Sequence, residues 1–144
     1  MLLFVQMSES IQVAVRVRPM NDNEKDSRED VVTANKVVSI QALDQAFTYT
    51  QVFGKHSTQN EVFSTCIQPL LPNLFSGFNL TILAYGQTGS GKTYTMGTAA
   101  SQNGIITKSI AKIFDQANSD TNCQFNVTVS FLEVPYTIYS LINN

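Results

Sequence analysis

The sequence predicts an α/β fold, and three consecutive segments support this class. Residues 80–85 form a short apolar run that is typical of a buried parallel strand. A glycine-rich segment, 86–91, follows directly, and residues 92–96 contain no Gly or Pro and can begin a helix. A buried strand, a glycine-rich turn and a helix in this order make one α/β unit.

The glycine-rich turn carries the most specific motif of the chain. Residues 86–93 read GQTGSGKT and fill every fixed position of the phosphate-loop pattern G-x-x-x-x-G-K-[ST]. Small residues let successive backbone N–H groups turn inward around phosphates, and the N-terminus of the following helix would point at them. Lys92 would place its charge between the terminal two phosphates of a nucleoside triphosphate, and the Thr93 hydroxyl would complete the shell of Mg²⁺. The candidate phosphate-binding residues are Gly86, Gln87, Thr88, Gly89, Ser90, Gly91, Lys92 and Thr93. An ordinary glycine-rich turn is the alternative, and the flanking strand and helix disfavour it.

Further elements precede the loop. Residues 11–17 alternate apolar and other side chains with the two-residue period of a strand, which Pro19 ends. The charged stretch 21–30 predicts a solvated loop, and residues 36–40 and 46–49 predict two short strands.

One helix is predicted in detail. Residues 58–61 read TQNE, a capping box in which Thr58 and Glu61 satisfy each other's free N–H groups. Pro69 and Pro72 predict a kink or weakened last turns, and Gly77 closes the element. Apolar residues at helical spacing predict a core-facing stripe: Val62, Phe63, Cys66, Ile67, Leu70, Leu71, Leu74 and Phe75.

Two elements are predicted after the loop. Apolar spacing from Ile105 to Phe114 indicates a helix that ends near Asn118, and the alternation over 125–131 predicts a strand. Residues 136–142 fit either a strand or a turn.

Composition excludes several classes of function. The chain has 144 residues, enough for one domain, and a net charge of −2 with nine scattered Lys and Arg, which argues against nucleic-acid binding by this segment. The apolar run 1–5 is too short for a signal peptide or a membrane span, so a cytosolic or nuclear protein without membrane contact is expected. Cys66 and Cys123 are expected to be buried reduced thiols, and the single histidine, His56, cannot assemble a zinc site.

Six motifs, in order, resemble the first part of a kinesin motor head. They are VAVRVRP (13–19), FTYTQVFG (47–54), TQNEVF (58–63), ILAYGQTGSGKTYTMG (82–97), NGIITKSI (103–110) and VSFLEV (129–134). The resemblance implies a three-layer P-loop NTPase fold with a mixed central sheet, helices on both faces and the later strands absent. It divides the chain into an N-terminal extension, 1–10, and the N-terminal part of a motor domain, 11–144. Two of the motifs look most similar to the chromokinesin branch.

The resemblance also implies binding roles, with ATP and Mg²⁺ as ligands. Arg16, Arg18 and Pro19 would line an adenine pocket, and Tyr94 would stack on the other side of the base. Two arginines on a strand would otherwise indicate a solvated face, and Tyr94 would otherwise be a core aromatic. Glu133 follows the last motif and is expected to be structural.

Some family features do not occur. Thr107 and Lys108 replace the family's Pro-Arg, and Pro135, Tyr136 and Thr137 replace its Tyr-Asn-Glu. Neither switch motif, Ser-Ser-Arg nor Asp-x-x-Gly-x-Glu, is found, so no catalytic residue is assigned.

We therefore expect the ATP-binding portion of a microtubule motor, without hydrolysis or microtubule binding of its own. Tubulin is the expected partner of the complete protein, and the dimerisation region lies outside this chain. The expected location is cytoplasmic, on microtubules, with the nucleus or spindle as options. The alternative is a degenerate, non-catalytic module that binds nucleotide or a partner.

The resemblance carries one structural concern. In kinesin heads the strand before the phosphate loop is flanked by strands from later in the chain. Residues 80–85 are therefore expected to lack a neighbour on either side, which would make the isolated chain poorly soluble or molten.

Overall fold

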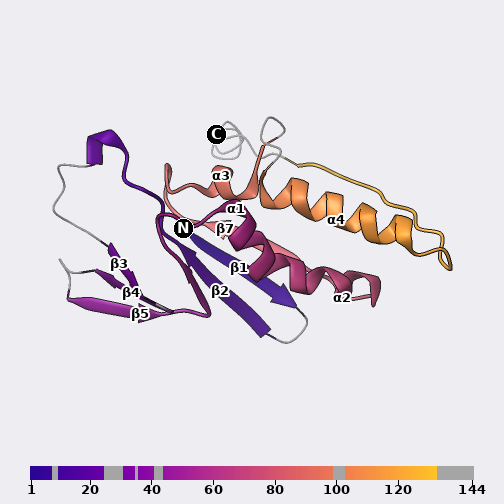
Figure 1. Ribbon diagram of the computed structural model, residues 1–144, viewed down its shortest axis with the longest axis horizontal. Coiled ribbons are helices and arrows are strands. Elements are labelled where there is room, and N and C mark those ends of the chain that lie inside the picture. The colour runs from indigo at the N-terminus through magenta and orange to yellow at the C-terminus, as the bar shows by residue number, and fades with distance from the viewer. Residues whose placement is uncertain (8–9, 25–30, 35, 41–43, 99–102, 133–144) are drawn as a thin grey trace, which may run out of the picture.

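The strands of the computed structural model form two sheets (Figure 1). The structure describes residues 1–7, 10–24, 31–34, 36–40, 44–98 and 103–132. The first sheet has the order β6-β2-β1-β7, with β1 at Leu2–Met7, β2 at Ser10–Arg16, β6 at Gln51–Phe53 and β7 at Thr81–Tyr85. The second is antiparallel, with β3 at Val31–Ala34, β4 at Val37–Ile40 and β5 at Gln45–Thr48. The strands predicted at 11–17, 36–40, 46–49 and 80–85 are thus confirmed.

The N-terminal residues supply a central strand. β1 lies between β2 and β7 and pairs antiparallel with both, with Leu3 opposite Ala14 on one side and Ala84 on the other. Residues 1–10 were expected to be an N-terminal extension. Residues 80–85 were expected to lack a neighbouring strand, and this expectation is wrong. The parallel pairing predicted for this strand is also wrong, because its neighbour belongs to a hairpin and runs in the opposite direction. The sheet is nevertheless mixed, since β2 and β6 are parallel.

The capped helix forms as predicted and is interrupted where the prolines stand. α1 (Gln59–Val62) begins after Thr58, whose Oγ1 accepts from the Glu61 N–H while Glu61 accepts from the Thr58 N–H at 2.6 Å. A π-helical turn over Phe63–Ile67, a 3₁₀ turn over Gln68–Leu70 and α2 (Leu71–Phe75) continue it. Pro69 and Pro72 stand in the first turns of the last two pieces, where a missing N–H costs no helix bond.

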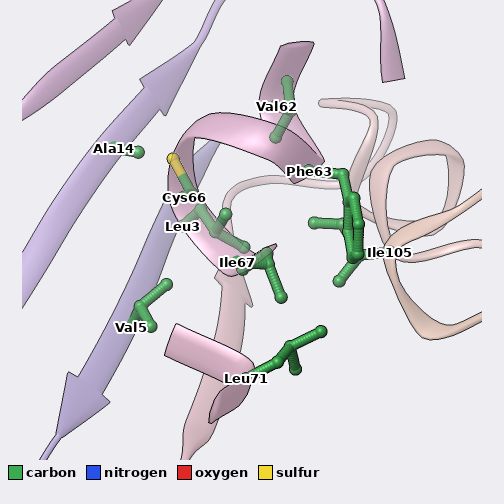
Figure 2. Close-up of a cluster of buried hydrophobic side chains, with 9 residues drawn as sticks. All are labelled: Leu3, Val5, Ala14, Val62, Phe63, Cys66, Ile67, Leu71 and Ile105. Atoms are coloured by element: carbon green, nitrogen blue, oxygen red, sulfur yellow. The ribbon is translucent and has the colours of Figure 1, made fainter. Parts of the chain in front are cut away.

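The core lies between this helical segment and one face of the first sheet (Figure 2). Leu3, Val5 and Ala14 of the sheet meet the predicted helical stripe, and Ile105 of α4 (Ile105–Ser119) closes the cluster. The buried members of the stripe are Val62, Phe63, Cys66, Ile67 and Leu71. Burial of each large aliphatic side chain stabilises the fold by about 1.5–3 kcal/mol.

The opposite face of the same sheet is open to solvent in part, although Val15 of β2 is buried on it. Ile11, Leu83 and Tyr85 are 62%, 54% and 62% exposed, and within the described part of the chain no helix packs on them. A shallow apolar hollow of about 190 Å³ lies there between Phe4, Ile11, Thr81 and Leu83. The predicted α/β class with a mixed sheet is confirmed, and the described helices form one of the two layers that the resemblance implies.

The C-terminal part of the described chain contains one confirmed element and one correction. The helix predicted from Ile105 forms as α4. The strand predicted over 125–131 does not form, and Val129 and Phe131 are 81% and 87% exposed. Alternation favours a strand only where another strand offers its hydrogen bonds, and this segment instead contacts α2 through an edge-to-face pair of Phe75 and Phe125. Glu133 and residues 135–142 lie outside the described residues.

Candidate functional site

The phosphate loop joins the end of β7 to the start of α3 (Lys92–Met96). Gly89 and Gly91 have φ of +79° and +95°, which only glycine adopts without strain. Lys92 turns back over the loop, and its Nζ donates to the carbonyl oxygens of Gly86 at 2.7 Å and Gln87 at 2.8 Å. The ammonium group is therefore held at the concave side of its own loop, where the motif requires it.

The interior of the loop fits a group that carries oxygen atoms. A Cβ added to Gly86 would stand 2.5 Å from Ser90 Oγ, so the backbone at this position approaches as closely as a glycine allows. Ser90 Oγ itself is buried and has no hydrogen-bond partner among the described residues. Thr93 is the second residue of α3 and is exposed. Together these residues offer a backbone cradle, one cation and two hydroxyl groups, a donor set suited to phosphate and Mg²⁺.

Arg16 is buried and forms the centre of a polar network. Its Nη1 donates to Gln59 Oε1 at 2.5 Å and to Thr95 Oγ1 at 3.0 Å, and its Nη2 donates to the Ser57 carbonyl at 3.0 Å. Only 8% of Arg16 is exposed, so the reading as a solvated strand face is wrong for this residue. Burial lowers the pKa of Arg16, but a guanidinium remains protonated in proteins, and the three acceptors compensate for its lost hydration.

Tyr94 lies directly against this network. The Cζ atom of Arg16 is 5.1 Å from the centre of the Tyr94 ring, and the Tyr94 carbonyl accepts from Gln59 Nε2 at 2.5 Å. Because Tyr94 is 65% exposed, it is not a core aromatic. A base stacked between Arg16 and Tyr94 would need roughly 7 Å, twice the usual van der Waals spacing. Arg16 and Tyr94 therefore do not enclose a base between them. Instead, the Arg16 guanidinium lies against one face of the Tyr94 ring.

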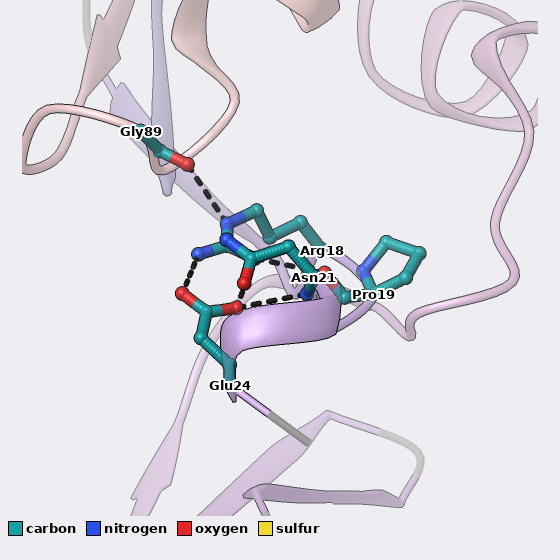
Figure 3. A network of polar contacts seen from close by, with 5 residues as sticks. All are labelled: Arg18, Pro19, Asn21, Glu24 and Gly89. Carbon is teal, nitrogen blue, oxygen red and sulfur yellow. Dashed lines mark hydrogen bonds and ion pairs between the residues drawn. The ribbon is translucent and has the colours of Figure 1, made fainter. Parts of the chain in front are cut away.

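Arg18 links the loop to the segment that follows β2 (Figure 3). Its Nε donates to the Gly89 carbonyl at 2.8 Å, and its guanidinium forms a bidentate ion pair with the Glu24 carboxylate. Glu24 belongs to a 3₁₀ turn, Asp22–Glu24, and also accepts from the Asn21 N–H at 3.0 Å. The hydrogen bonds from Arg18 and Asn21 lower the pKa of Glu24 to about 2, so this carboxylate stays charged at neutral pH.

Half of the twelve sequence-predicted residues line one cleft of about 510 Å³. This volume is in the range of small-molecule sites. Its lining includes six of the predicted residues: Arg16, Arg18, Pro19, Gly89, Ser90 and Tyr94. The other phosphate-loop residues, Gly86, Gln87, Thr88, Gly91, Lys92 and Thr93, are not among the lining residues and continue the site along the loop.

Sequence reasoning missed the residues that hold this cleft together. Gln59 is 6% exposed and Thr95 1% exposed, and both accept hydrogen bonds from Arg16. Lys55 and Ser57, from the segment before α1, are among the residues that line the cleft. The one available signal was polar Gln59 at the first position of a helix whose next turns are apolar. Its partner lies 43 residues away in sequence, so the signal alone could not identify the contact.

Two further observations concern other classes of site. In the described ranges no group of three or more His, Cys, Asp and Glu could hold a metal ion, and no helix is long and apolar enough to cross a membrane. Cys66 is buried, which raises the pKa of its thiol to about 11. Cys123 is exposed, so the expectation that both thiols are buried is wrong for Cys123, which lies in the extended segment after α4.

Comparison with known proteins identifies the family. A family model described as the kinesin motor domain matches residues 16–143. The kinesin-like protein KIF27 of Homo sapiens is 44% identical over 133 residues, and the kinesin-like protein KIN-4A of Oryza sativa subsp. japonica is 40% identical over 131. The chromosome-associated kinesin KIF4 of Mus musculus is 38% identical over 136 residues. Each match covers 86% of this chain but only 10%, 13% and 11% of the relative, respectively.

A solved structure agrees with the sequence matches. The Drosophila kinesin family member Kin10/NOD, in complex with divalent manganese and ADP, superposes with a TM-score of 0.61 and 26% identity. The superposition covers 77% of this chain and 39% of that structure. The chain belongs to the kinesin motor-domain family, whose members bind nucleotide, and its fold is a partial kinesin motor fold.

Proposed function

We propose that these residues form the ATP- and Mg²⁺-binding portion of a microtubule motor whose complete chain couples ATP hydrolysis to movement. One observation carries the proposal. Gly89 and Ser90 of the phosphate loop line one cleft with the Arg16–Pro19 segment, about 70 residues away in sequence, and Arg18 Nε donates a 2.8 Å hydrogen bond to the Gly89 carbonyl. Family membership and the ADP and manganese named for the Drosophila relative support it.

We assign the roles of the individual residues accordingly. Backbone N–H groups of the loop, other than that of Ser90, which donates to the Gln87 carbonyl, and the Lys92 ammonium would hold the phosphates. Thr93 would supply a hydroxyl to Mg²⁺, which offsets phosphate charge when bound. Pro19 and the exposed side of the Tyr94 ring flank the base. Arg16 supports Tyr94, and Arg18 fixes Gly89 relative to Pro19.

We assign ATP hydrolysis and microtubule binding to the complete protein. Neither motif that positions the attacking water in kinesins occurs in these 144 residues, so we propose nucleotide binding without turnover for the segment by itself. Residues 11–144 are then the first part of the motor domain, tubulin is the partner of the complete motor, and cytoplasmic microtubules are its location, with the spindle or nucleus as alternatives.

The same absence favours a second candidate, a degenerate module that holds nucleotide or a partner without turnover. ATPase activity of the complete protein distinguishes the two. A motor hydrolyses ATP faster when microtubules are added, whereas a degenerate module gives the same low rate with and without them.

Replacement of the loop lysine tests nucleotide binding. Lys92→Ala removes the cation at the phosphates, and loss of a charge-assisted hydrogen bond weakens binding by at least about tenfold. The measurement is the Kd of a fluorescent ATP analogue in the presence of Mg²⁺. Lys112→Ala, an exposed lysine on α4, is the matched control and should bind as the unchanged chain does. Equal affinity of Lys92→Ala and Lys112→Ala would contradict the assignment.

A further inference from the structure

Gln59 is a buried amide that stands beside the cleft without lining it. It is the first residue of α1 and is 6% exposed. Burial of an amide costs free energy unless its polar atoms find partners. Here Oε1 accepts from Arg16 Nη1 and Nε2 donates to the Tyr94 carbonyl, each at 2.5 Å. One side chain therefore connects the end of β2 to α3, across 43 and 35 residues of sequence.

The end of α3 explains why the Tyr94 carbonyl accepts from a side chain. The last four carbonyl groups of a helix have no partner inside it. The Gly97 N–H donates to the Thr93 carbonyl at 2.8 Å, and the next donor along a longer helix would come from residue 98. Because α3 ends at Met96, Gln59 Nε2 supplies the donor instead. Gln59 thus fixes the Tyr94 backbone at the point where the helix stops.

The Tyr94 ring is restrained through the same residue. The Arg16 guanidinium lies 5.1 Å from the ring centre, and Arg16 is itself hydrogen-bonded to Gln59 and Thr95. The ring is 65% exposed, and Tyr94 lines the cleft. Gln59 therefore restrains Tyr94 twice, at its backbone directly and at its ring through Arg16.

Different side chains restrain the phosphate end of the cleft. Lys92 Nζ donates to the carbonyls of Gly86 and Gln87, and Arg18 Nε donates to the Gly89 carbonyl. Among the residues that the structure describes, Gln59 forms no hydrogen bond to the loop 86–93. The two ends of the cleft can therefore be disturbed separately.

We propose that Gln59 is a positioning residue for the base end of the cleft: it holds the Tyr94 ring where a nucleobase can stack. The residue type suits this role, because an amide offers an acceptor and a donor together, whereas a carboxylate lacks the donor and an ammonium group lacks the acceptor. The inference rests on the proposed nucleotide binding and adds a determinant of base affinity that does not line the cleft.

Gln59→Leu in the complete protein tests the role, since leucine has a similar size and neither polar atom. Calorimetric titration gives the Kd of Mg·ATP and of Mg·tripolyphosphate, which has the phosphates but no base. We expect the Kd of Mg·ATP to rise at least about tenfold, because the base loses its stacking surface, and that of Mg·tripolyphosphate to change less than about twofold. Gln68→Leu, the same substitution at an exposed position of the same helical segment, is the matched control and should change neither. Equal weakening of both ligands by Gln59→Leu would mean general damage and would overturn the inference.

A double-mutant cycle with Tyr94→Ala tests whether Gln59 acts through Tyr94. Tyr94→Ala alone should weaken Mg·ATP at least about as much as Gln59→Leu does. In the Tyr94→Ala background, Gln59→Leu should change the Kd of Mg·ATP by less than about twofold, because the group that it positions is gone. The same loss from Gln59→Leu in both backgrounds would overturn the inference.

Gln59→Glu takes the place of Gln59→Leu if the leucine variant does not fold. It keeps the acceptor for Arg16 and the side-chain shape, and removes only the donor to the Tyr94 carbonyl. The Kd of Mg·ATP should then rise about threefold to tenfold, the net contribution of one hydrogen bond. An unchanged Kd of Mg·ATP would overturn the inference and leave nucleotide binding intact. If the unchanged protein binds neither ligand, the proposed function itself fails.

Discussion

Both faces of the first sheet carry apolar residues, but the two faces have different surroundings. On one face, Leu3 of β1 and Ala14 of β2 are buried beneath the helical segment. On the other, Ile11 of β2 and Leu83 of β7 are more than half exposed. An alternating apolar pattern therefore identifies a strand, but which face becomes core depends on what packs against it. Three measurements test this difference, beginning with the largest expected effect.

Neighbouring residues of β1 provide the strongest contrast. Leu3→Ala should lower the free energy of unfolding by about 2–5 kcal/mol, because it leaves a cavity in the core. Phe4→Ala, the larger deletion, should cost less than about 1.5 kcal/mol, since its side chain is half-buried on the open face. Urea unfolding of both variants gives the comparison. Equal losses would mean that the open face is covered in solution.

The covering helix should respond to pH through its first turn. Hydrogen bonds from the Thr58 backbone and hydroxyl lower the pKa of Glu61. A lowered pKa stabilises the fold above the carboxyl group's ordinary pKa, and this contribution is lost as the pH falls through the lowered value. The unchanged chain should therefore lose more stability between pH 6 and pH 3 than Glu61→Gln. Because Glu24 titrates in both chains, its contribution cancels, and parallel stability curves would contradict the prediction.

The smallest effect is expected on the open face. Leu83→Thr should change the free energy of unfolding by no more than about 0.5 kcal/mol and should raise solubility, because it removes exposed apolar surface. Ile82→Thr, the neighbour that packs against the core, should cost about 1–3 kcal/mol. Thermal melts and the concentration at which each variant precipitates are the measurements. A large loss from Leu83→Thr would show that the face is covered.

Local signals predicted local structure well. The capping box at Thr58 and the helix from Ile105 depend on hydrogen bonds and spacing within a few residues, which a sequence displays directly. β1 was missed because an inner strand with apolar residues on both faces lacks alternation, and one of its two neighbours, β7, is distant in sequence. Residues 125–131 show the reverse case, in which alternation is present and a pairing partner is not.

The candidate site likewise combines residues that the local sequence predicts with contacts that it does not predict. The phosphate loop is a contiguous motif, so its residues could be predicted from spacing alone. The resemblance to kinesins supplied Arg16, Arg18, Pro19 and Tyr94, but not how they contact one another. Arg16 donates hydrogen bonds to Gln59 and Thr95, which belong to two other elements. Sequence periodicity does not show which distant elements come into contact, so these hydrogen bonds could not be predicted.

The position of Met1 has a practical consequence for anyone who prepares this protein. Its carbonyl is bonded to the Arg16 N–H, and its Cα atom stands beside Gly86 at the mouth of the phosphate loop. An affinity tag or fluorescent protein fused ahead of Met1 would start beside Gly86 and would crowd the beginning of the phosphate loop. Cys123, which is exposed, is a better place for a label in binding studies.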